Sequence, residues 1–461
     1  MKIKMAVLLA ISLLSGLAGK WIGFSNEQMV VMSIFVMSVL GTLFFWDFKL
    51  SFVFIGTGVL LCVGAVTMEK FIQYASLDVI LFLIAMMIIV GMMKDAGFFE
   101  WLITIVLRVK NLTGKKMFAI LMVASAIFSA LMGEVTSIIV MTMVILNICD
   151  FLEVDPLPLI LSAVLATNIG SASTVLGNPV GVLIAARGKL SFEDFLAHAL
   201  PLSALVLTGT IWFLLIWYRK YIQVLNDRIQ PYGEDKGFLY LISIPPDIRT
   251  KISIRIFFVT IILISLHKRL EMFLNLEHNT LLIMIPVVAA GIVMLYRHDR
   301  ARHYIEREVE WPSLLFFMFL FAQAGVIQSS GIADLLASKI FGSIGNNPRA
   351  LSGVVLFSSG FLSSCLDNVV TVASYVPIVK SLEVFHFNLK PLWWALLFGA
   401  CYGGNITMVG STANIVALGL LEKERNIKVT FGMWLKVGLT VGIMSMIIVY
   451  IFFLFVPQFF N

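Results

Sequence analysis

Two clusters of polar residues inside apolar sequence are the best candidates for chemistry in this chain. Each cluster combines one carboxylate with several hydroxyl and amide side chains. A carboxylate can carry a proton or bind a cation, and neutral hydroxyls and amides can bind a small polar solute. The carboxylates are Glu134 and Asp367, and the candidate substrate-binding residues are Asn168, Ser171, Ser173, Thr174, Asn178, Asn368, Asn405, Thr407, Ser411, Thr412 and Asn414.

The second cluster repeats the first at a constant spacing without a gap. Glu134 and Asp367 are 367 − 134 = 233 residues apart, and Gly170 and Gly403 have the same separation. A duplicated pair of irregular polar segments is the sequence feature that best indicates a transporter binding site between two repeats.

Each carboxylate lies between two apolar runs, which we interpret as the arms of a re-entrant hairpin. Non-helical backbone at membrane depth persists only where it lines protein or water, and a carboxylate there costs about 2.5–3.5 kcal/mol on insertion scales. We therefore expect Glu134 and Asp367 to couple transport to H⁺ or Na⁺. The alternative is that the tips are shallow and that the acids cap helices, with Asp367 as an N-cap.

A second pair of breaks follows short apolar half-helices that start near Pro158 and Pro391. We interpret Thr167–Ser171 and Gly403–Asn405 as the breaks, where small residues let the backbone approach a ligand. Helix N-termini follow where the chain restarts, after Pro179 and Thr412. Packing of small residues between membrane helices is the alternative. Because packing would not need an Asn at both breaks, we expect a substrate site.

The composition is that of a polytopic membrane protein. Hydrophobic residues make up 60% of the chain and charged residues 13%, about half the usual charged share of soluble domains, and the mean hydropathy is +0.98. The formal charge of +6 fits a membrane-orientation bias rather than nucleic-acid binding. The lipid bilayer is thus the expected surrounding.

Motifs of enzymes and metal sites are missing from the sequence. The four cysteines show no CxxC spacing, and there is no nucleophile elbow, Walker loop or HExxH motif. We therefore expect no enzyme activity, no metal and no cofactor, with a proton or sodium gradient as the driving force. Any pump ATPase must be a separate chain.

The apolar runs predict an all-α protein with two inverted repeats, each containing a re-entrant hairpin and a broken transmembrane helix. We divide the chain into N-terminal scaffold helices, the first repeat, a cytoplasmic connector, further scaffold helices with a basic loop, and the second repeat. Their respective ranges are 1–76, 77–218, 219–253, 254–311 and 312–461. The stretches Gly97–Arg108 and Gly331–Leu336 are predicted to lie in the membrane interface.

The distribution of basic loops predicts the orientation. The connector and the loop with Arg297, Arg300, Arg302 and Arg307 are separated by two spans, so both can be cytoplasmic. Counting from them places equivalent segments of the two halves on opposite faces, which makes the repeats inverted. We expect a multi-pass protein of the plasma membrane, with a cytoplasmic N-terminus and an extracytoplasmic C-terminus.

At these residues the chain resembles the ArsB/NhaD branch of the ion transporter superfamily, including permeases akin to the melanosomal P protein. The motifs that carry the resemblance are Asn168 to Gly181, Leu366-Asp367-Asn368-Val369 and Gly404-Asn405-x-Thr407-x-x-Gly410-x-x-Ala413-Asn414. The resemblance implies inverted repeats, elevator-like alternating access and a homodimer. The chain departs from the family pattern at Glu134, where Asn is usual, and at Asn178–Gly181, where the family has Asp-Pro-Pro-Asn. Alignment to the family motif pairs Glu134 with Asn368, whereas the gapless repeat pairs it with Asp367.

Three classes of cargo follow from these residues. Two carboxylates disfavour a dicarboxylate anion unless a cation neutralises them. The prediction is proton-coupled efflux of arsenite or antimonite, in which a neutral hydroxide binds the Ser, Thr and Asn groups and a carboxylate carries the exchanged proton. The alternative is a Na⁺/H⁺ antiporter, in which Glu134 and Asp367 bind the two cations competitively. A dicarboxylate or other anion carrier, and a channel, are less favoured.

Overall fold

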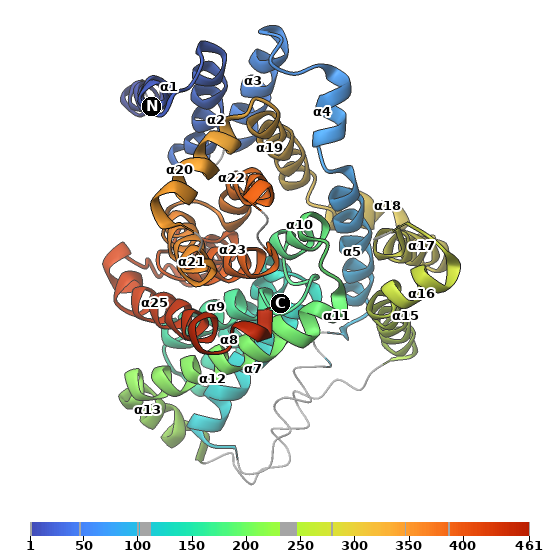
Figure 1. Cartoon of the computed structure of the whole chain (residues 1–461). Helices are drawn as coiled ribbons and strands as arrows, with labels where there is room; N and C mark the ends of the chain where they lie inside the picture. The colour runs from blue at the N-terminus through green and yellow to red at the C-terminus, as the bar shows by residue number, and fades with distance from the viewer. Residues whose placement is uncertain are drawn as a thin grey trace. The chain divides into compact units, whose positions relative to one another are not determined.

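The computed structural model describes residues 2–45, 48–98, 101, 112–230, 247–277, 280–345, 347–385 and 388–460, and the regular structure in these ranges is helical (Figure 1). Nine of the helices in these ranges are long and apolar enough to cross a membrane. A tenth span results if α15 (Ile248–Ser265) and α16 (His267–Leu274), which are bent by 62° at their junction, are counted together. The chain is therefore a multi-pass membrane protein, as its composition predicts.

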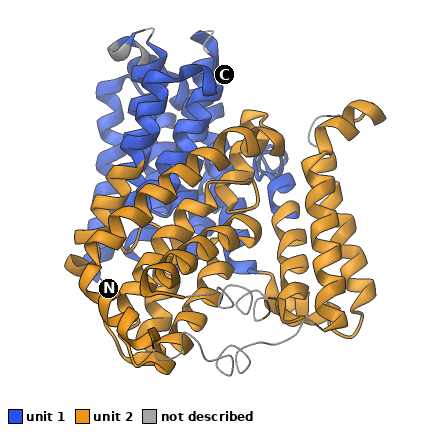
Figure 2. Ribbon diagram, turned by 90° about the horizontal axis from the view of Figure 1, so that it is seen from below, with its two compact units in different colours: residues 1–81, 310–404, 446–461 blue, residues 82–309, 405–445 orange. Residues whose placement is uncertain are grey.

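The chain forms two compact units that are interleaved along the sequence (Figure 2). Unit 1 comprises residues 1–81, 310–404 and 446–461, and unit 2 comprises residues 82–309 and 405–445. The chain passes between the units four times. Two crossings lie inside the continuous helices α5 (Leu77–Asp95) and α25 (Phe431–Phe455), one lies between Val309 and Glu310, and one follows α23 (Lys390–Gly403). The predicted repeats are consecutive in sequence, whereas the compact units are not.

Unit 1 contains the N-terminal helices and the hairpin of the second half. The hairpin consists of α21 (Pro348–Cys365) and α22 (Asn368–Ser381), and α23 packs against both arms. The other elements of unit 1, apart from its parts of α5 and α25, are α1 (Lys2–Ile22), α2 (Asn26–Phe44), α3 (Lys49–Cys62), α4 (Met68–Tyr74), α19 (Trp311–Ser329), α20 (Ile332–Ile344), η5 (Leu382–Phe385) and η6 (Pro457–Phe460).

Unit 2 contains the hairpin of the first half, formed by α7 (Gly114–Met132) and α8 (Glu134–Leu152), and the broken helix formed by α9 (Leu157–Ser171) and α10 (Pro179–Gly188). It also contains α24 (Thr412–Arg425), which packs against α8 and α9. The remaining elements are α11 (Phe192–Asp194), η2 (Phe195–Ala199), α12 (Leu200–Trp217), α13 (Arg219–Ile229), α15, α16, α17 (Thr280–Tyr296), α18 (Ala301–His303), η4 (Tyr304–Glu308) and parts of α5 and α25.

The half-helices start where the sequence predicts. Pro158 and Pro391 lie in the first turns of α9 and α23, where the missing N–H of proline has no intrahelical partner to lose. After each break, a polar side chain caps the next helix: Asn178 accepts a hydrogen bond from the backbone of Gly181, and Ser411 accepts one from that of Ala413. The side-chain caps therefore determine where α10 and α24 begin.

The interpretation of Thr167–Ser171 as a break is wrong. Helix α9 continues through these residues and ends at Ser171, so the first non-helical segment is Ala172–Asn178. Within a buried helix, Ser171 Oγ donates to the Asn168 carbonyl (2.9 Å), so the hydroxyl is satisfied without leaving the helix. The second half-helix ends at Gly403, close to the prediction.

Backbone contact joins each half-helix to the hairpin in its own unit. A Cβ at Gly170 would lie 2.2 Å from the Ala126 carbonyl of α7, and a Cβ at Gly403 would lie 2.2 Å from the Gly360 carbonyl of α21. Both distances are far below van der Waals contact, so a methyl group cannot be accommodated at either position. The two glycines are those paired by the sequence repeat, 403 − 170 = 233.

The predicted interfacial stretches and the connector have different outcomes. Most of Gly97–Arg108 lies outside the described residues, whereas the second stretch begins α20 at Ile332. No helix is predicted within the connector, but its first residues form α13, which buries Ile222, Leu225 and Ile229. These apolar residues are spaced three and four positions apart, which places them on one face of α13 and makes the helix amphipathic.

Candidate functional site

Three asparagines from the two broken segments meet inside unit 2. Asn168 Nδ2, on α9, donates to Asn405 Oδ1 and to Asn414 Oδ1, both at 2.8 Å. Asn405 follows the end of α23, and Asn414 lies in the first turn of α24. All three side chains are buried. The structure thus brings together the asparagines that the sequence singled out in both halves, and we name these three residues the amide cluster.

Backbone and aromatic groups hold the amide cluster in place. Asn405 Nδ2 donates to the Leu165 carbonyl (3.3 Å), and Asn414 Nδ2 donates to the Thr407 carbonyl (2.9 Å). The Asn405 carbonyl accepts a hydrogen bond from Trp434 Nε1 (3.0 Å). Trp434 was missed from the sequence because a tryptophan within an apolar span carries no signal for such a role.

The side-chain oxygen of Asn168 is the unsatisfied atom of the cluster. Asn168 Oδ1 is buried and accepts no hydrogen bond from the residues that the structure describes. Leaving a buried acceptor unpaired costs about 1–3 kcal/mol, and buried polar atoms in native proteins are nearly always paired. A solute that carries a hydrogen-bond donor would satisfy this oxygen.

Most of the other residues of the first half that were predicted to bind substrate instead stabilise the non-helical segment after α9. Asn178 Nδ2 donates to Ser171 Oγ (2.9 Å), Ser173 Oγ donates to the Gly170 carbonyl (2.6 Å), and Thr174 Oγ1 donates to the Ala130 carbonyl. These bonds tie the non-helical segment to α9 and α7. The side chains therefore shape the surroundings of the amide cluster.

The second break is built in a similar way. Ser411 is the N-cap of α24, and Thr412 is the first residue of that helix. Thr407 Oγ1 accepts a hydrogen bond from the Val409 N–H (3.2 Å), and the Thr407 carbonyl accepts one from Asn414 Nδ2. The hydroxyl groups thus stabilise the backbone that presents Asn405 and Asn414.

The first hairpin tip, in unit 2, combines a glycine with a buried carboxylate. Gly133 joins α7 to α8 with φ +90° and ψ 152°, and it gives α8 no side-chain cap. Glu134 is the first residue of α8, and only 4% of its surface is exposed. A carboxylate at a helix N-terminus is stabilised by the helix dipole, so the position suits a buried acid.

The second hairpin tip, in unit 1, has its carboxylate one position earlier. Asp367 is the N-cap of α22, its Oδ1 accepts a hydrogen bond from the Val369 N–H (3.0 Å), and 6% of its surface is exposed. The capping role that the sequence left as an alternative is therefore present. Asn368 is the first residue of α22 and is also buried.

The helix caps determine which residues of the two tips correspond. Helices α8 and α22 begin 368 − 134 = 234 residues apart, whereas α9 and α23 begin 390 − 157 = 233 apart, as do α10 and α24. The gapless register therefore holds for the broken helices and is shifted by one residue at the hairpins. Glu134 corresponds to Asn368, in agreement with the alignment by motif.

A lysine of unit 1 that the sequence analysis did not single out interacts electrostatically with Asp367. Lys49 is the first residue of α3, and its Nζ lies 5.2 Å from the centre of the Phe316 ring. The charges of Asp367 and of Glu310, the N-cap of α19, both act on its ammonium group. Burial raises the pKa of Glu310, and the positive charge of Lys49 opposes that rise. We call Lys49, Glu310 and Asp367 the charged cluster.

Comparisons with known proteins find a transporter family and several transporters. A sequence model of the CitMHS family, described as a citrate transporter, matches residues 35–399. An uncharacterised transporter of Mycobacterium tuberculosis is 30% identical over 359 residues, which cover 75% of this chain and 78% of the relative. The human P protein is 25% identical over 426 residues, covering 77% of this chain and 50% of that protein.

A solved structure shares the fold. The YdaH transporter of Alcanivorax borkumensis superimposes with a TM-score of 0.51 and 14% sequence identity, covering 83% of this chain and 85% of that one. Together with the sequence matches, this similarity places the described helices in a transporter fold.

Proposed function

We propose that this chain, which belongs to the CitMHS citrate transporter family, is a secondary-active transporter for a small neutral solute that carries hydroxyl donors. The cargo that fits best is arsenous acid, with antimonous acid as its analogue, moved outward in exchange for protons. The observation that carries the proposal is the buried, unpaired carbonyl oxygen of Asn168 within the amide cluster.

The chemistry of the amide cluster favours a neutral cargo. Its three side chains are uncharged amides, and an unpaired ion in a buried site of this kind would be strongly disfavoured. Arsenous acid is neutral at physiological pH, and each of its oxygens carries a proton. One of its hydroxyls could donate to Asn168 Oδ1, which would remove the cost of the unpaired acceptor.

The two tip carboxylates are the candidates for proton coupling. Glu134 and Asp367 are both buried at the starts of hairpin helices, where a change of protonation alters the energy of the site. The resemblance of the motifs to the ArsB/NhaD branch supports the same cargo. We infer elevator-like alternating access, in which protonation of a tip carboxylate accompanies the return of the empty site.

A second candidate cargo is an organic anion such as citrate. The family is described by citrate transport, and Lys49 supplies a positive charge close to Asp367. This cation weakens the objection that two carboxylates would repel an anion. The Na⁺/H⁺ antiporter is the third candidate, because amide and carboxylate oxygens are suitable ligands for Na⁺.

Transport by the purified chain in proteoliposomes with an imposed pH gradient distinguishes the three candidates. Arsenite, Na⁺, Li⁺ and citrate are tested separately while proton movement is recorded with a pH-sensitive dye. The proposal expects proton movement with arsenite. Movement with Na⁺ or Li⁺ but not arsenite would establish the antiporter instead, and movement with citrate alone would establish the anion carrier.

Replacement of Asn168 tests whether the amide cluster binds the cargo. In Asn168→Ala the carbonyl acceptor and both amide donors are lost, so we expect KM to rise about 10-fold or more, the effect of one buried hydrogen bond. Asn226→Ala is the matched control, because Asn226 accepts a hydrogen bond from the Gly114 N–H outside the cluster. An unchanged KM in Asn168→Ala would mean that the cluster serves packing alone.

A further inference from the structure

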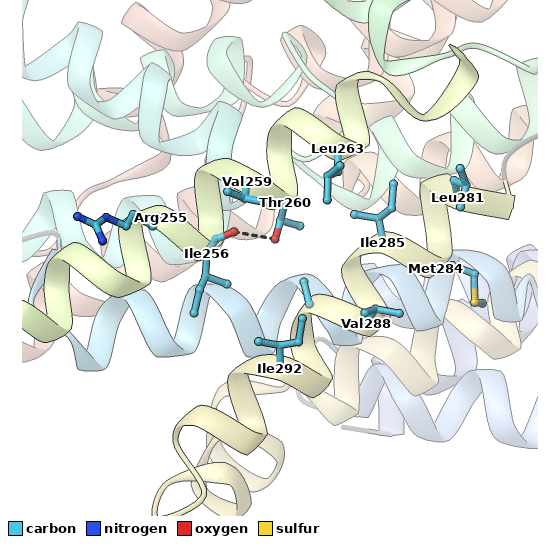
Figure 3. A pocket seen from close by; sticks show the side chains of 11 residues that line it. Arg255, Ile256, Val259, Thr260, Leu263, Leu281, Met284, Ile285, Val288 and Ile292 are labelled. Atoms are coloured by element: carbon cyan, nitrogen blue, oxygen red, sulfur yellow. Dashed lines mark hydrogen bonds between the residues drawn. The ribbon is translucent and has the colours of Figure 1, made fainter. Parts of the chain in front are cut away.

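An apolar groove between α15 and α17 in unit 2 ends at a cationic side chain. Its volume is about 400 Å³, and every residue that lines it is apolar except Arg255 and Thr260. The Thr260 hydroxyl donates to the Ile256 carbonyl (2.8 Å), so it offers the groove no free donor (Figure 3). The groove is therefore a hydrocarbon surface with a single charge at its end.

The two helices run antiparallel, and their side chains form the walls of the groove. Figure 3 shows Ile256 of α15 beside Ile292 of α17, and Leu263 facing Ile285 further along, with Arg255 at the Ile256 end. From Arg255 to Leu263 the groove extends about 12 Å along α15. This length is close to half of the ~30 Å hydrocarbon core of a bilayer, so the groove matches one acyl chain of one leaflet.

A second cation extends the charged end. Lys251 lies four residues before Arg255, on the same face of α15, and both side chains are exposed. Arg297, just beyond the end of α17, is held by Asp95 (3.0 Å) and Asp299 (3.2 Å). Lys251 and Arg255, by contrast, form no ion pair with any residue that the structure describes. Two adjacent cations thus remain available to a ligand.

We propose that this groove binds an anionic phospholipid, with one acyl chain between α15 and α17 and the phosphate on Arg255 and Lys251. The guanidinium of Arg255 can hold two phosphate oxygens at once, and the exposed Val259 and Val288 contact the acyl chain. Basic residues beside apolar clefts are the usual means by which membrane proteins select anionic headgroups. The inference is independent of the cargo that the protein carries.

Lipid titration of the purified full-length chain tests the proposal. The protein in detergent is titrated with phosphatidylglycerol or with phosphatidylcholine of the same acyl chains, and bound lipids are counted by native mass spectrometry. We expect phosphatidylglycerol to bind more tightly, and Arg255→Gln and Lys251→Gln each to weaken it roughly five-fold. Val288→Trp should fill the groove and weaken both lipids.

Two control variants separate this site from the general lipid shell. Lys20→Gln removes a cation at the end of the apolar helix α1, and Val30→Trp adds the same bulk to an exposed position on α2; neither should change lipid binding. Equal binding of the two lipids, or equal loss in Lys20→Gln and Arg255→Gln, would overturn the proposal. A change from dimer to monomer in Val288→Trp without loss of lipid would also overturn it, since a second copy of the chain would then cover the groove.

Discussion

At the first hairpin tip, Gly133 precedes the second arm and the carboxylate of Glu134 begins that arm. At the second tip, the carboxylate of Asp367 is itself the cap and the amide of Asn368 begins the arm. At the first tip, the positive φ of glycine lets the chain turn into the second arm. At the second tip, the side chain of Asp367 caps the second arm with a hydrogen bond. The two acids therefore occupy different structural positions.

The surroundings of the two acids sharpen this difference. Asp367 gives one oxygen to the Val369 N–H (3.0 Å), and its charge acts on the ammonium group of Lys49. At the second tip, Asn368 occupies the position that Glu134 has at the first. We propose that the tips are related by duplication but specialised. Because the second tip has an amide at the position of Glu134, Asp367 is the better candidate for a residue that gains and loses a proton in each cycle.

The largest expected effect is on coupling. Asp367→Asn should lower proton-coupled transport on the order of 100-fold, the scale of a lost proton-transfer group, while the protein stays folded because Asn is an equally good N-cap. Glu134→Gln places an amide where the second tip already has one, so its transport should fall much less. Both rates are measured in proteoliposomes. Equal losses in the two variants would mean that the acids act as an equivalent pair.

An intermediate effect is expected on stability at the first tip. Gly133 has φ +90° and ψ 152°, a conformation almost restricted to glycine, so Gly133→Ala should cost about 1–3 kcal/mol. A Cβ there would meet no other atom, and the cost is therefore one of backbone strain. Thermal unfolding in detergent measures it.

The matched control for this variant is Gly419→Ala. Gly419 lies inside α24, and a Cβ there also meets no atom, so alanine should leave stability unchanged or raise it by up to about 1 kcal/mol. A loss of stability at Gly419 equal to that at Gly133 would contradict the role of the positive φ.

The smallest expected effect is a pH dependence from the charged cluster. The pKa of Glu310 is raised above its usual 4.5, and Lys49 limits the rise, so Lys49→Gln should raise the pKa of Glu310 further. A raised folded-state pKa favours the folded protein below the unfolded-state value, and that advantage is lost as pH rises through the folded-state value. Both proteins should lose stability as pH rises above about 4.5, and the difference between them should grow only as pH passes the folded-state pKa of Glu310 in the wild type, because the variant continues to lose stability there.

Thermal unfolding over a pH series measures this difference. Lys70→Gln, an exposed lysine of α4 in the same unit, is the control and should show the same pH dependence as wild type. If Lys49→Gln also runs parallel to wild type at all pH values, the charge of Lys49 does not act on Glu310.

Local signals made the broken helices predictable. Proline at the start of a half-helix and an Asn or Ser cap at each restart act within one turn, so the starts of α9 and α23 follow from sequence. The end of α9 does not, because Thr167–Ser171 have a composition typical of a break. Their hydroxyls bond within the helix or remain buried, and only the packed structure shows that the helix continues to Ser171.

Long-range relations were predictable in part. The sequence repeat indicated that Asn168, Asn405 and Asn414 belong to one site, and the structure brings their side chains into contact. Lys49 could not be found in this way, since it lies 367 − 49 = 318 residues from Asp367 and reads as an ordinary basic flank of an apolar helix. The one-residue shift of the hairpins follows from the motif alignment but not from the gapless repeat, and the helix caps decide between the two.

The glycine contacts described for α9 and α23 have a mechanical consequence. Where two backbones touch at a residue without a side chain, neither helix can roll about its own axis, because rolling would drive a neighbouring side chain into the gap. The contacts at Gly170 and Gly403 therefore hold each half-helix in a fixed orientation against its hairpin. We expect each hairpin and its half-helix to move as one body, so that a displacement of a hairpin tip would also displace the segment that follows the half-helix.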